Sequence, residues 1–232
     1  MRDRRRTLLH AAITATATAA AAFTLAPAVH AASADVSEHH DPSEPAAAAP
    51  DAGPGPSADE QIGVIRQGAL AWNAWRSRHP VVRPDFRGAN LTDLDLAGAD
   101  LRGADLRGAD LRGSGLLAAD LAGADLSDAS LPDVALAGAD LTNADLTRAD
   151  LRGARLTEAD LTGALLSRTR LAGANLTRAD ATTAVLADAD LTGANLTGAD
   201  LDRADLTGAE LTDAILTGAD LNCHGHYMCE LQ

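Results

Sequence analysis

Apolar residues recur every five positions between residues 85 and 221. Taking the larger apolar residue as the centre of each repeat, 28 consecutive centres run from Phe86 to Leu221, and all are leucine except Phe86 and Ala181. Alanine stands two residues before the centre in 23 of these 28 repeats, and an Asp or Asn usually lies between the two. A period of five fits neither an amphipathic helix nor a strand, whose periods are 3.6 and 2. The pattern therefore predicts a repeat architecture with one continuous interior.

Five residues are enough for one short extended side and one corner. Gly occupies the second place after the centre in 14 of 27 links, where it permits the positive φ that a type II turn requires at its third residue. Where Asp, Asn, Arg, Glu or Thr replaces this Gly, we expect a turn without positive φ. Four sides would close a coil of about 20 residues, so the repeats predict about seven coils stacked at the spacing of β-strands.

The pattern Ala-(Asp/Asn)-Leu-x-x over residues 85–221 resembles that of the pentapeptide repeat family. The resemblance implies an all-β fold, a right-handed quadrilateral parallel β-helix, and no particular chemistry. Known members include proteins that imitate DNA and protect gyrase. Familiar gyrase-binding members pair through their C-terminal ends, and the few residues after the last repeat here resemble a cap more than such a dimerising segment.

Residues 57–84 predict a helical cap on the N-terminal end of the coils. An open end exposes core leucines and unpaired backbone groups, so repeat arrays need caps. Ser57 and Glu60 form a capping-box pattern, and the helical spacing of apolar residues predicts one amphipathic helix over 57–78. Trp72 and Trp75 are expected to cover the end leucines, with a ligand platform as the alternative role. The sequence over 68–76 and 83–86 also resembles the leader found before the repeats in many bacterial pentapeptide repeat proteins.

Residues 1–34 predict an export signal. Four arginines within the first six residues precede an Ala/Thr/Leu-rich stretch over 8–25, and small residues suited to cleavage follow it. The run Arg5-Arg6-Thr7-Leu8-Leu9 also resembles a twin-arginine signal, so the export route stays open. The apolar stretch is too short for a membrane span. We therefore expect a secreted or cell-surface protein without a transmembrane anchor after cleavage.

Residues 35–56 predict a disordered linker because Ala, Pro, Ser, Gly and acidic residues cannot bury a core. His39 and His40 are adjacent within it. We expect both histidines to be solvated rather than bound to a metal ion.

The repeat stops after Leu221, and residues 222–232 predict a C-terminal cap. In an exported protein, Cys223 and Cys229 are expected to form a disulfide, with Tyr227 and Met228 covering the last leucines. The alternative is a metal cluster of cysteines and histidines, for which the Cys-His-x-His-x₂-Cys spacing is too cramped to form an ordinary tetrahedral zinc site. We expect no metal and no other cofactor.

Residues twenty apart should stack, which allows the outward positions to be sorted by face. On one face the residue before every centre is an aspartate, and we name this set the aspartate column: Asp100, Asp120, Asp140, Asp160, Asp180, Asp200 and Asp220. It is a candidate surface for a basic protein partner or for divalent cations. The alternative is that these aspartates only form hydrogen bonds at the corners. A second candidate is the uneven face, where the acidic pattern is lost: Asp95, Gly115, Ala135, Arg155, Asn175, Asn195 and Ile215.

The charge of the chain and its lack of catalytic motifs limit the classes of function that we expect. The chain has 33 acidic residues against 19 basic ones, all arginine, for a formal net charge of −14. This balance disfavours direct nucleic-acid binding but is compatible with mimicry of DNA. No nucleophile elbow or phosphate loop is present, and exposed carboxylates lack the burial that tunes a catalytic pKa.

We therefore expect a non-enzymatic, exported structural or protein-interaction module, whose partner and oligomeric state the sequence leaves unknown. One alternative is a DNA mimic that binds and protects gyrase. A second alternative is a metal-binding or enzymatic role through the Cys/His tail.

Overall fold

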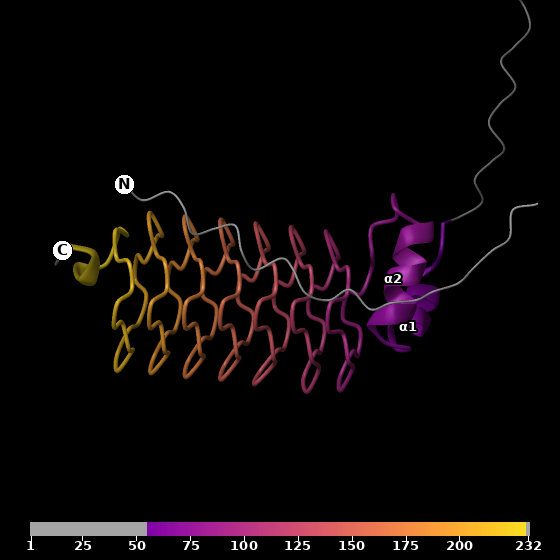
Figure 1. The fold of residues 1–232 in the computed structure, drawn as a ribbon, viewed down its shortest axis with the longest axis horizontal. Coiled ribbons are helices and arrows are strands. Elements are labelled where there is room, and N and C mark those ends of the chain that lie inside the picture. Colours follow the sequence, from indigo (N-terminus) through magenta and orange to yellow (C-terminus); the bar gives the residue numbers. More distant parts are fainter. Residues whose placement is uncertain (1–54, 231–232) are drawn as a thin grey trace, which may run out of the picture. The chain divides into compact units, whose positions relative to one another are not determined.

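The computed structural model describes residues 55–230. The predicted export signal, most of the predicted linker, His39 and His40 lie outside the described residues. Within 55–230 the elements are two short helices, α1 (Ala58–Ile65) and α2 (Ala69–Arg78), and a 3-10 helix, η1 (Tyr227–Glu230). The repeats lie between α2 and η1 and form a stack of coils (Figure 1). No helix in this part of the chain is long and apolar enough to cross a bilayer.

Parallel β-bridges join residues twenty positions apart along the whole repeat region. They begin with Asp85↔Asp105 and continue to Asp200↔Asp220, always at the residue before a repeat centre. Each side of a coil is therefore one extended residue between two turns, and four such sides make one coil of a quadrilateral parallel β-helix. The final bridge, Asp205↔His224, marks the point where the chain leaves the repeat register.

Every corner of the coil has the same backbone conformation. All 27 residues at the second place after a centre have positive φ, and 13 of these are not glycine. Asp93, for example, has φ 59° and Ala118 has φ 51°. The expectation of a turn without positive φ at the non-glycine corners is therefore wrong. The corner N–H groups donate to the next coil, as Gly88 does to the Arg107 carbonyl at 2.8 Å and Asp93 to the Arg112 carbonyl at 3.0 Å. These hydrogen bonds between coils outweigh the preference of non-glycine residues for negative φ.

Ala118→Gly is expected to stabilise the protein for this reason. The left-handed conformation costs a residue with a Cβ about 1–2 kcal/mol, while the greater freedom of Gly in the unfolded chain offsets about 0.5–1 kcal/mol of the gain. We expect the free energy of unfolding, measured by urea denaturation, to rise by about 0.5–1 kcal/mol. The control is Ala97→Gly, at an equally exposed corner position without positive φ. That change should lower stability, and a rise equal to that of Ala118→Gly would contradict the explanation.

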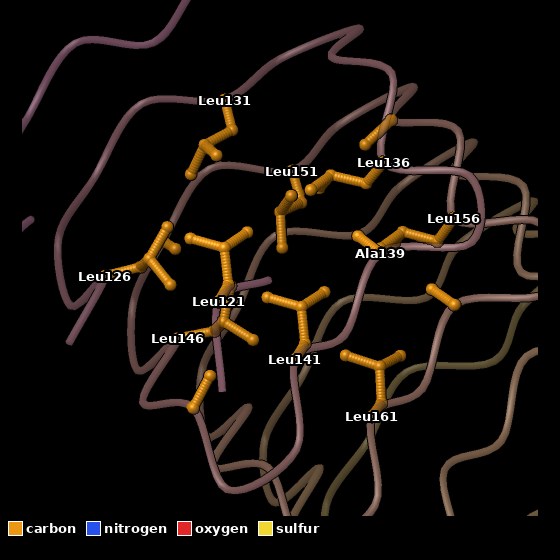
Figure 2. Close-up of a cluster of buried hydrophobic side chains, with 14 of the residues drawn as sticks. Leu121, Leu126, Leu131, Leu136, Ala139, Leu141, Leu146, Leu151, Leu156 and Leu161 are labelled. Carbon is orange, nitrogen blue, oxygen red and sulfur yellow. The ribbon is translucent and has the colours of Figure 1, made fainter. Parts of the chain in front are cut away.

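The core is one continuous cluster inside the coils. Every leucine centre from Leu91 to Leu206 is buried, and alanines pack beside them. Figure 2 shows the leucines of neighbouring coils directed into the same interior. Two polar residues replace alanine there without leaving an unpaired group. The Ser114 Oγ donates to the Leu91 carbonyl at 2.6 Å, and the Thr169 Oγ1 donates to the Leu146 carbonyl at 2.7 Å.

The residues before the repeats form two helices, and the expectation of one helix over 57–78 is wrong. Ser57 caps α1, since its Oγ accepts the Glu60 N–H at 3.2 Å. Gly68 separates the helices with φ 94°, a conformation that disfavours other residues. The first N–H of α2, from Ala69, then donates to the Asp95 carbonyl of the first coil at 3.2 Å. The break therefore lets α2 turn and pair with the β-helix.

Trp72 and Trp75 of α2 belong to the same buried cluster as the leucines. Their rings stack with centroids 4.9 Å apart, and the Trp72 ring lies 5.1 Å from that of Phe86, the first repeat centre. The Trp72 Nε1 donates to the Asp100 carbonyl at 2.7 Å. Because both indoles are buried, neither ring face is open to a ligand, and the ligand-platform alternative does not hold.

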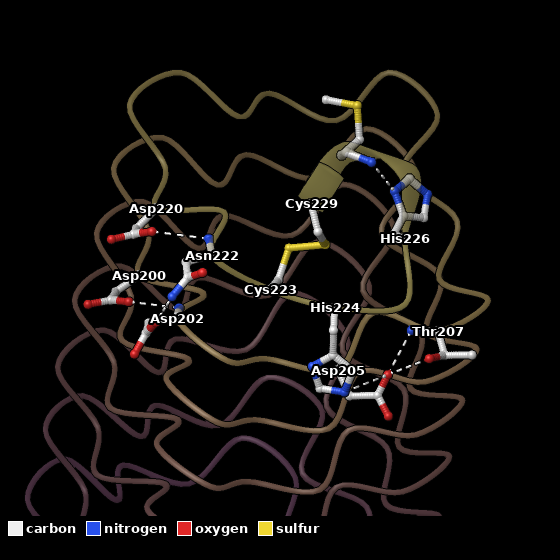
Figure 3. Close-up of a disulfide and its surroundings, with 11 residues drawn as sticks. Asp200, Asp202, Asp205, Thr207, Asp220, Asn222, Cys223, His224, His226 and Cys229 are labelled. Atoms are coloured by element: carbon white, nitrogen blue, oxygen red, sulfur yellow. Dashed lines mark hydrogen bonds and ion pairs between the residues drawn. A yellow bond between two sulfur atoms is a disulfide. The ribbon is translucent and has the colours of Figure 1, made fainter. Parts of the chain in front are cut away.

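The C-terminal end has the expected disulfide but differs from the expected cap at Tyr227. The sulfur atoms of Cys223 and Cys229 are joined in a disulfide, 2.06 Å apart, and both residues pack against the core cluster (Figure 3). The Tyr227 side chain does not cover the last leucines: Tyr227 is 66% exposed, and its ring packs on His226 at 4.5 Å. Tyr227 lies at the start of η1, inside the short loop that the disulfide closes. Leu216 and Leu221 are only partly buried.

Candidate interaction surface

The aspartate column is continuous in the structure. Six successive bridges join its seven members, from Asp100↔Asp120 to Asp200↔Asp220. In each, Oδ1 accepts the backbone N–H of the residue two positions later, at distances from 2.9 Å for Thr142 to 3.3 Å for Arg102. Figure 3 shows this bond for Asp200 and Asp220. The corner hydrogen bond anticipated as the alternative role is therefore present in every member. It occupies only one carboxylate oxygen.

Positive partners are confined to the N-terminal end of the column. The Arg102 guanidinium binds Asp100 in a bidentate manner, with Nη2 2.7 Å from Oδ2 and Nε 2.9 Å from Oδ1, and its Nε lies 3.3 Å from Asp120 Oδ2. The hydrogen bond from Arg102 lowers the pKa of Asp100 below its ordinary value. Burial raises the pKa of Asp120, with a smaller contribution from Asp140 and Asp100.

The other five aspartates of the column make no ion pair with any described residue. We name them the open aspartates: Asp140, Asp160, Asp180, Asp200 and Asp220. Each keeps an oxygen that the corner hydrogen bond does not use. The open aspartates thus form a row of carboxylates at the bridge spacing of about 4.8 Å, without a resident cation among residues 55–230 to neutralise them.

Arginines two residues after an aspartate form a pattern that sequence reasoning missed. The motif Asp-Leu-Arg places Arg one position past a centre, and its guanidinium folds back onto the carboxylate. Arg107 Nη2 lies 2.6 Å from Asp105 Oδ2, and Arg112 and Arg152 hold Asp110 and Asp150 in the same way. The two-residue separation of Asp and Arg in the sequence was the signal that could have predicted these ion pairs. Within the aspartate column only Asp100 is followed by an arginine two positions later, and each open aspartate is followed there by Thr, Asp or Asn.

These pairs predict a loss of stability in acid. The hydrogen bond from Arg107 holds the pKa of Asp105 below its ordinary value, against the opposing effect of burial. Because the pKa is lower in the folded state, the stabilisation is present above the unfolded value of about 4 and is lost as pH falls through the folded pKa. We expect the free energy of unfolding to be nearly flat from neutral pH to about pH 5 and to fall below about pH 4.

Arg107→Gln should reduce that acid dependence, as measured by urea denaturation at a series of pH values. The matched control is Arg155→Gln, since Arg155 makes no ion pair with the described residues. An acid dependence unchanged in Arg107→Gln, or reduced equally in both variants, would contradict the assignment.

The uneven face is partly explained by internal packing. Ser114, which stands directly before Gly115 in the place where most repeats have alanine, accepts the Leu94 N–H at 3.0 Å while donating to the Leu91 carbonyl. Ile215 is exposed at the last coil. The hydrogen bonds of Ser114 account for one of the variable positions of this face without a ligand.

The Cys/His tail presents a disulfide rather than two thiols. Over residues 55–230, no group of three or more His, Cys, Asp or Glu side chains is arranged to hold a metal ion. His224 Nε2 instead lies 3.6 Å from Asp205 Oδ1.

A family model described as pentapeptide repeats matches eight copies in this chain, over residues 85–114, 119–157, 154–184 and 184–222. The chain belongs to the pentapeptide repeat family. Members of this family fold as right-handed quadrilateral β-helices, which gives the hand of the coils described above. They are generally structural or interaction modules.

Solved pentapeptide repeat proteins share the repeat. HetL, involved in heterocyst differentiation regulation in the cyanobacterium Nostoc sp. strain PCC 7120, is 37% identical, with 61% of this chain and 73% of HetL covered and a TM-score of 0.43. A protein from the Arabidopsis thaliana thylakoid lumen is 33% identical, with 53% and 71% covered and a TM-score of 0.34. QnrB1, a plasmid-mediated fluoroquinolone resistance protein, is 26% identical, with 60% and 76% covered and a TM-score of 0.32. No curated protein matches the chain.

Proposed function

We propose that this pentapeptide repeat protein is a non-enzymatic, exported interaction module that binds a basic protein partner through the open aspartates. The observation that supports this proposal is the row of five carboxylates without ion-pair partners among the described residues. The formal charge of −14 adds a long-range attraction for cationic surfaces.

The energetics of the row favour a cationic partner. Two unit charges about 5 Å apart repel by roughly 0.8 kcal/mol in water, before screening by salt. Lysine or arginine side chains laid along the row would relieve this repulsion and bind the carboxylate oxygens that the corner hydrogen bonds leave free. Because all of these groups are near the surface, the binding should weaken as salt is added.

Neutralising two open aspartates tests the surface. Asp160→Asn/Asp180→Asn keeps the side-chain oxygen that accepts the corner N–H but removes two negative charges. The control, Asp190→Asn/Glu210→Gln, removes the same charge from bridged neighbours on another face. With a hexa-arginine peptide as the probe in a titration at low salt, we expect the first variant to bind several-fold more weakly than the control. An equal loss of affinity in both variants would mean that only the net charge of the protein matters, and it would overturn the assignment of the binding surface to the open aspartates.

The second part of the proposal is export, which rests on the signal-like sequence of residues 1–34. Fractionation of the native host, followed by N-terminal sequencing, tests it directly. The expected result is a mature start near Ala32 or Asp35 outside the cytoplasm. An intact Met1 in the cytoplasm would refute export and leave the carboxylate surface to be explained by an intracellular partner.

A DNA mimic that binds and protects gyrase is the alternative function, and the acidic charge of the chain is the observation that favours it. It requires the protein to reach the cytoplasm. The discriminating measurement is a gyrase supercoiling assay with added protein. Protection of gyrase, together with an intact N-terminus, would favour this alternative over the exported module.

A further inference from the structure

A hollow of about 540 Å³ lies between the segment that follows α2 and the corners of the coils. Its volume is within the range of about 300–1,000 Å³ that is usual for ligand sites. Three arginines line it, Arg76, Arg83 and Arg102, and no acidic residue does. Arg76 and Arg102 both lie beside Asp100, so Arg83 is the arginine of the hollow without an ion pair among the described residues. We propose that the hollow is a binding site for a peptide carboxylate flanked by an aliphatic side chain.

Arg76 supplies a positive charge beneath the surface of the hollow. Its side chain is only 9% exposed, and Nη1 donates to the Val82 carbonyl at 2.6 Å. Its Nε has no hydrogen-bond partner among the described residues and lies 3.7 Å from Asp100 Oδ2. A buried guanidinium needs a close negative charge. Asp100 provides one only in part, because the same carboxylate is held by Arg102 in bidentate contact.

Arg83 provides the charge that a ligand can reach. Its side chain is exposed, and its Nε donates to the Gly103 carbonyl at 3.0 Å, which fixes the guanidinium beside the corner of the coil. It makes no ion pair with the described residues. Asp105 is close enough to feel its charge, but that carboxylate already binds Arg107. Arg83 therefore keeps its remaining donors for an incoming carboxylate, which a guanidinium binds with matched geometry.

The remaining walls suit an aliphatic group and an approaching peptide backbone. Pro80, Val81 and Val82 line the hollow on the side of the loop, and Val81 is 94% exposed, so an aliphatic side chain could cover it. Gly103 and Gly123 form the opposite corners. A Cβ built on either glycine would meet no atom within 4 Å, so both corners are open to the ligand. Basic and apolar walls together select a carboxylate next to an aliphatic residue rather than a bare inorganic anion.

This site borders the N-terminal end of the aspartate column, since Arg102 lines it and also binds Asp100 and Asp120, but it differs from the open aspartates in residues and in charge. Its proposal does not depend on export or on the basic partner. A protein with both sites would hold a basic segment on the coils and an acidic or C-terminal peptide segment at the N-terminal cap.

Calorimetric titration of the full chain at low salt tests the site. The first probe is acetyl-Gly-Gly-Ala-Val-Leu with a free C-terminal carboxylate, and its C-terminal amide is the control. A third peptide, acetyl-Gly-Val-Glu-Val-Gly-amide, carries the carboxylate on a side chain. We expect the free acid or the glutamate peptide to bind and the first amide not to bind, and the comparison of the two acids identifies the source of the carboxylate. No saturable binding of either acid up to millimolar peptide, or equal binding of the amide, overturns the proposal.

Single variants distinguish binding in the hollow from a general attraction between the charges of the protein and the peptide. Arg83→Gln should weaken binding by roughly tenfold or more, since a charge-assisted hydrogen bond is lost without disturbing an internal ion pair. Arg155→Gln removes the same charge outside the hollow, also without breaking an ion pair among the described residues, and should bind as the wild type does. Val81→Ser should weaken only probes with an aliphatic side chain beside the carboxylate. Equal affinity of Arg83→Gln and wild type, or binding of inorganic phosphate in place of both acids, is the result that overturns the assignment.

Discussion

Leu141→Asp is expected to abolish cooperative folding of the repeat region. Leu141 is fully buried in the middle of the stack, and Leu121 and Leu161 occupy the equivalent positions one coil away on either side (Figure 2). Removing the leucine costs about 2–5 kcal/mol through lost burial and the resulting cavity. Placing a polar group there without a hydrogen-bond partner costs about another 2–7 kcal/mol. The sum is comparable to the whole stability of a typical domain, about 5–15 kcal/mol.

Thermal unfolding followed by circular dichroism measures this effect. Leu141→Met is the matched control, because a hydrophobic residue of similar volume usually costs less than about 1.5 kcal/mol. We expect a single transition for Leu141→Met and none for Leu141→Asp. Since each coil contacts only its neighbours, a defect in the middle should interrupt the stack rather than damage one end. A transition for Leu141→Asp like that of the wild type would show that the interior accepts water or charge, and the packed-core description would be wrong.

The repeat in the sequence predicted a coil of about 20 residues from its period of five over 28 centres, and the family resemblance implied the right-handed quadrilateral form. The corners were predicted less well. Arg148 and Thr183 stand where glycine would be preferred, yet both have positive φ. Local propensity acts on one residue, whereas coil-to-coil hydrogen bonds recur at most of the corners along the stack. A sequence rule that treats corners one at a time therefore cannot predict their conformation.

For the candidate site, too, the repeat predicted which residues stack, but not which side chains contact one another. Stacking of the aspartate column followed from counting in twenties. Counting in twenties did not predict that the aspartates at the N-terminal end of the column are ion-paired while the others are not. This difference depends on Arg102, which folds back to Asp100 and reaches Asp120 in the next coil. The hollow beside α2 was beyond prediction for a similar reason. Arg76, Arg83 and Arg102 meet only after Gly68 has broken the helix and α2 has docked on the first coil.

Trp72→Ala is expected to have the second large effect, because it removes the main contact between α2 and the coils. The indole is fully buried, contacts Trp75 and Phe86, and donates to the Asp100 carbonyl at 2.7 Å. Truncation of a buried tryptophan costs about 3–5 kcal/mol. We expect a loss of that size in the free energy of unfolding, measured by urea denaturation with far-ultraviolet circular dichroism, which does not depend on tryptophan emission.

Two further variants identify the cause of the loss. Leu70→Ala changes a residue of the same helix that is 90% exposed, and it should alter stability by no more than about 0.5 kcal/mol. Trp72→Phe keeps most of the apolar contact but leaves the Asp100 carbonyl without its indole donor, so its loss should fall between the other two. If Trp72→Ala were as stable as Leu70→Ala, α2 would not be held to the coils by this residue. The first coil would then have to be stable with its leucines unprotected, a result at odds with the continuous core that joins Ile65 and Phe86 to the leucines of the repeats.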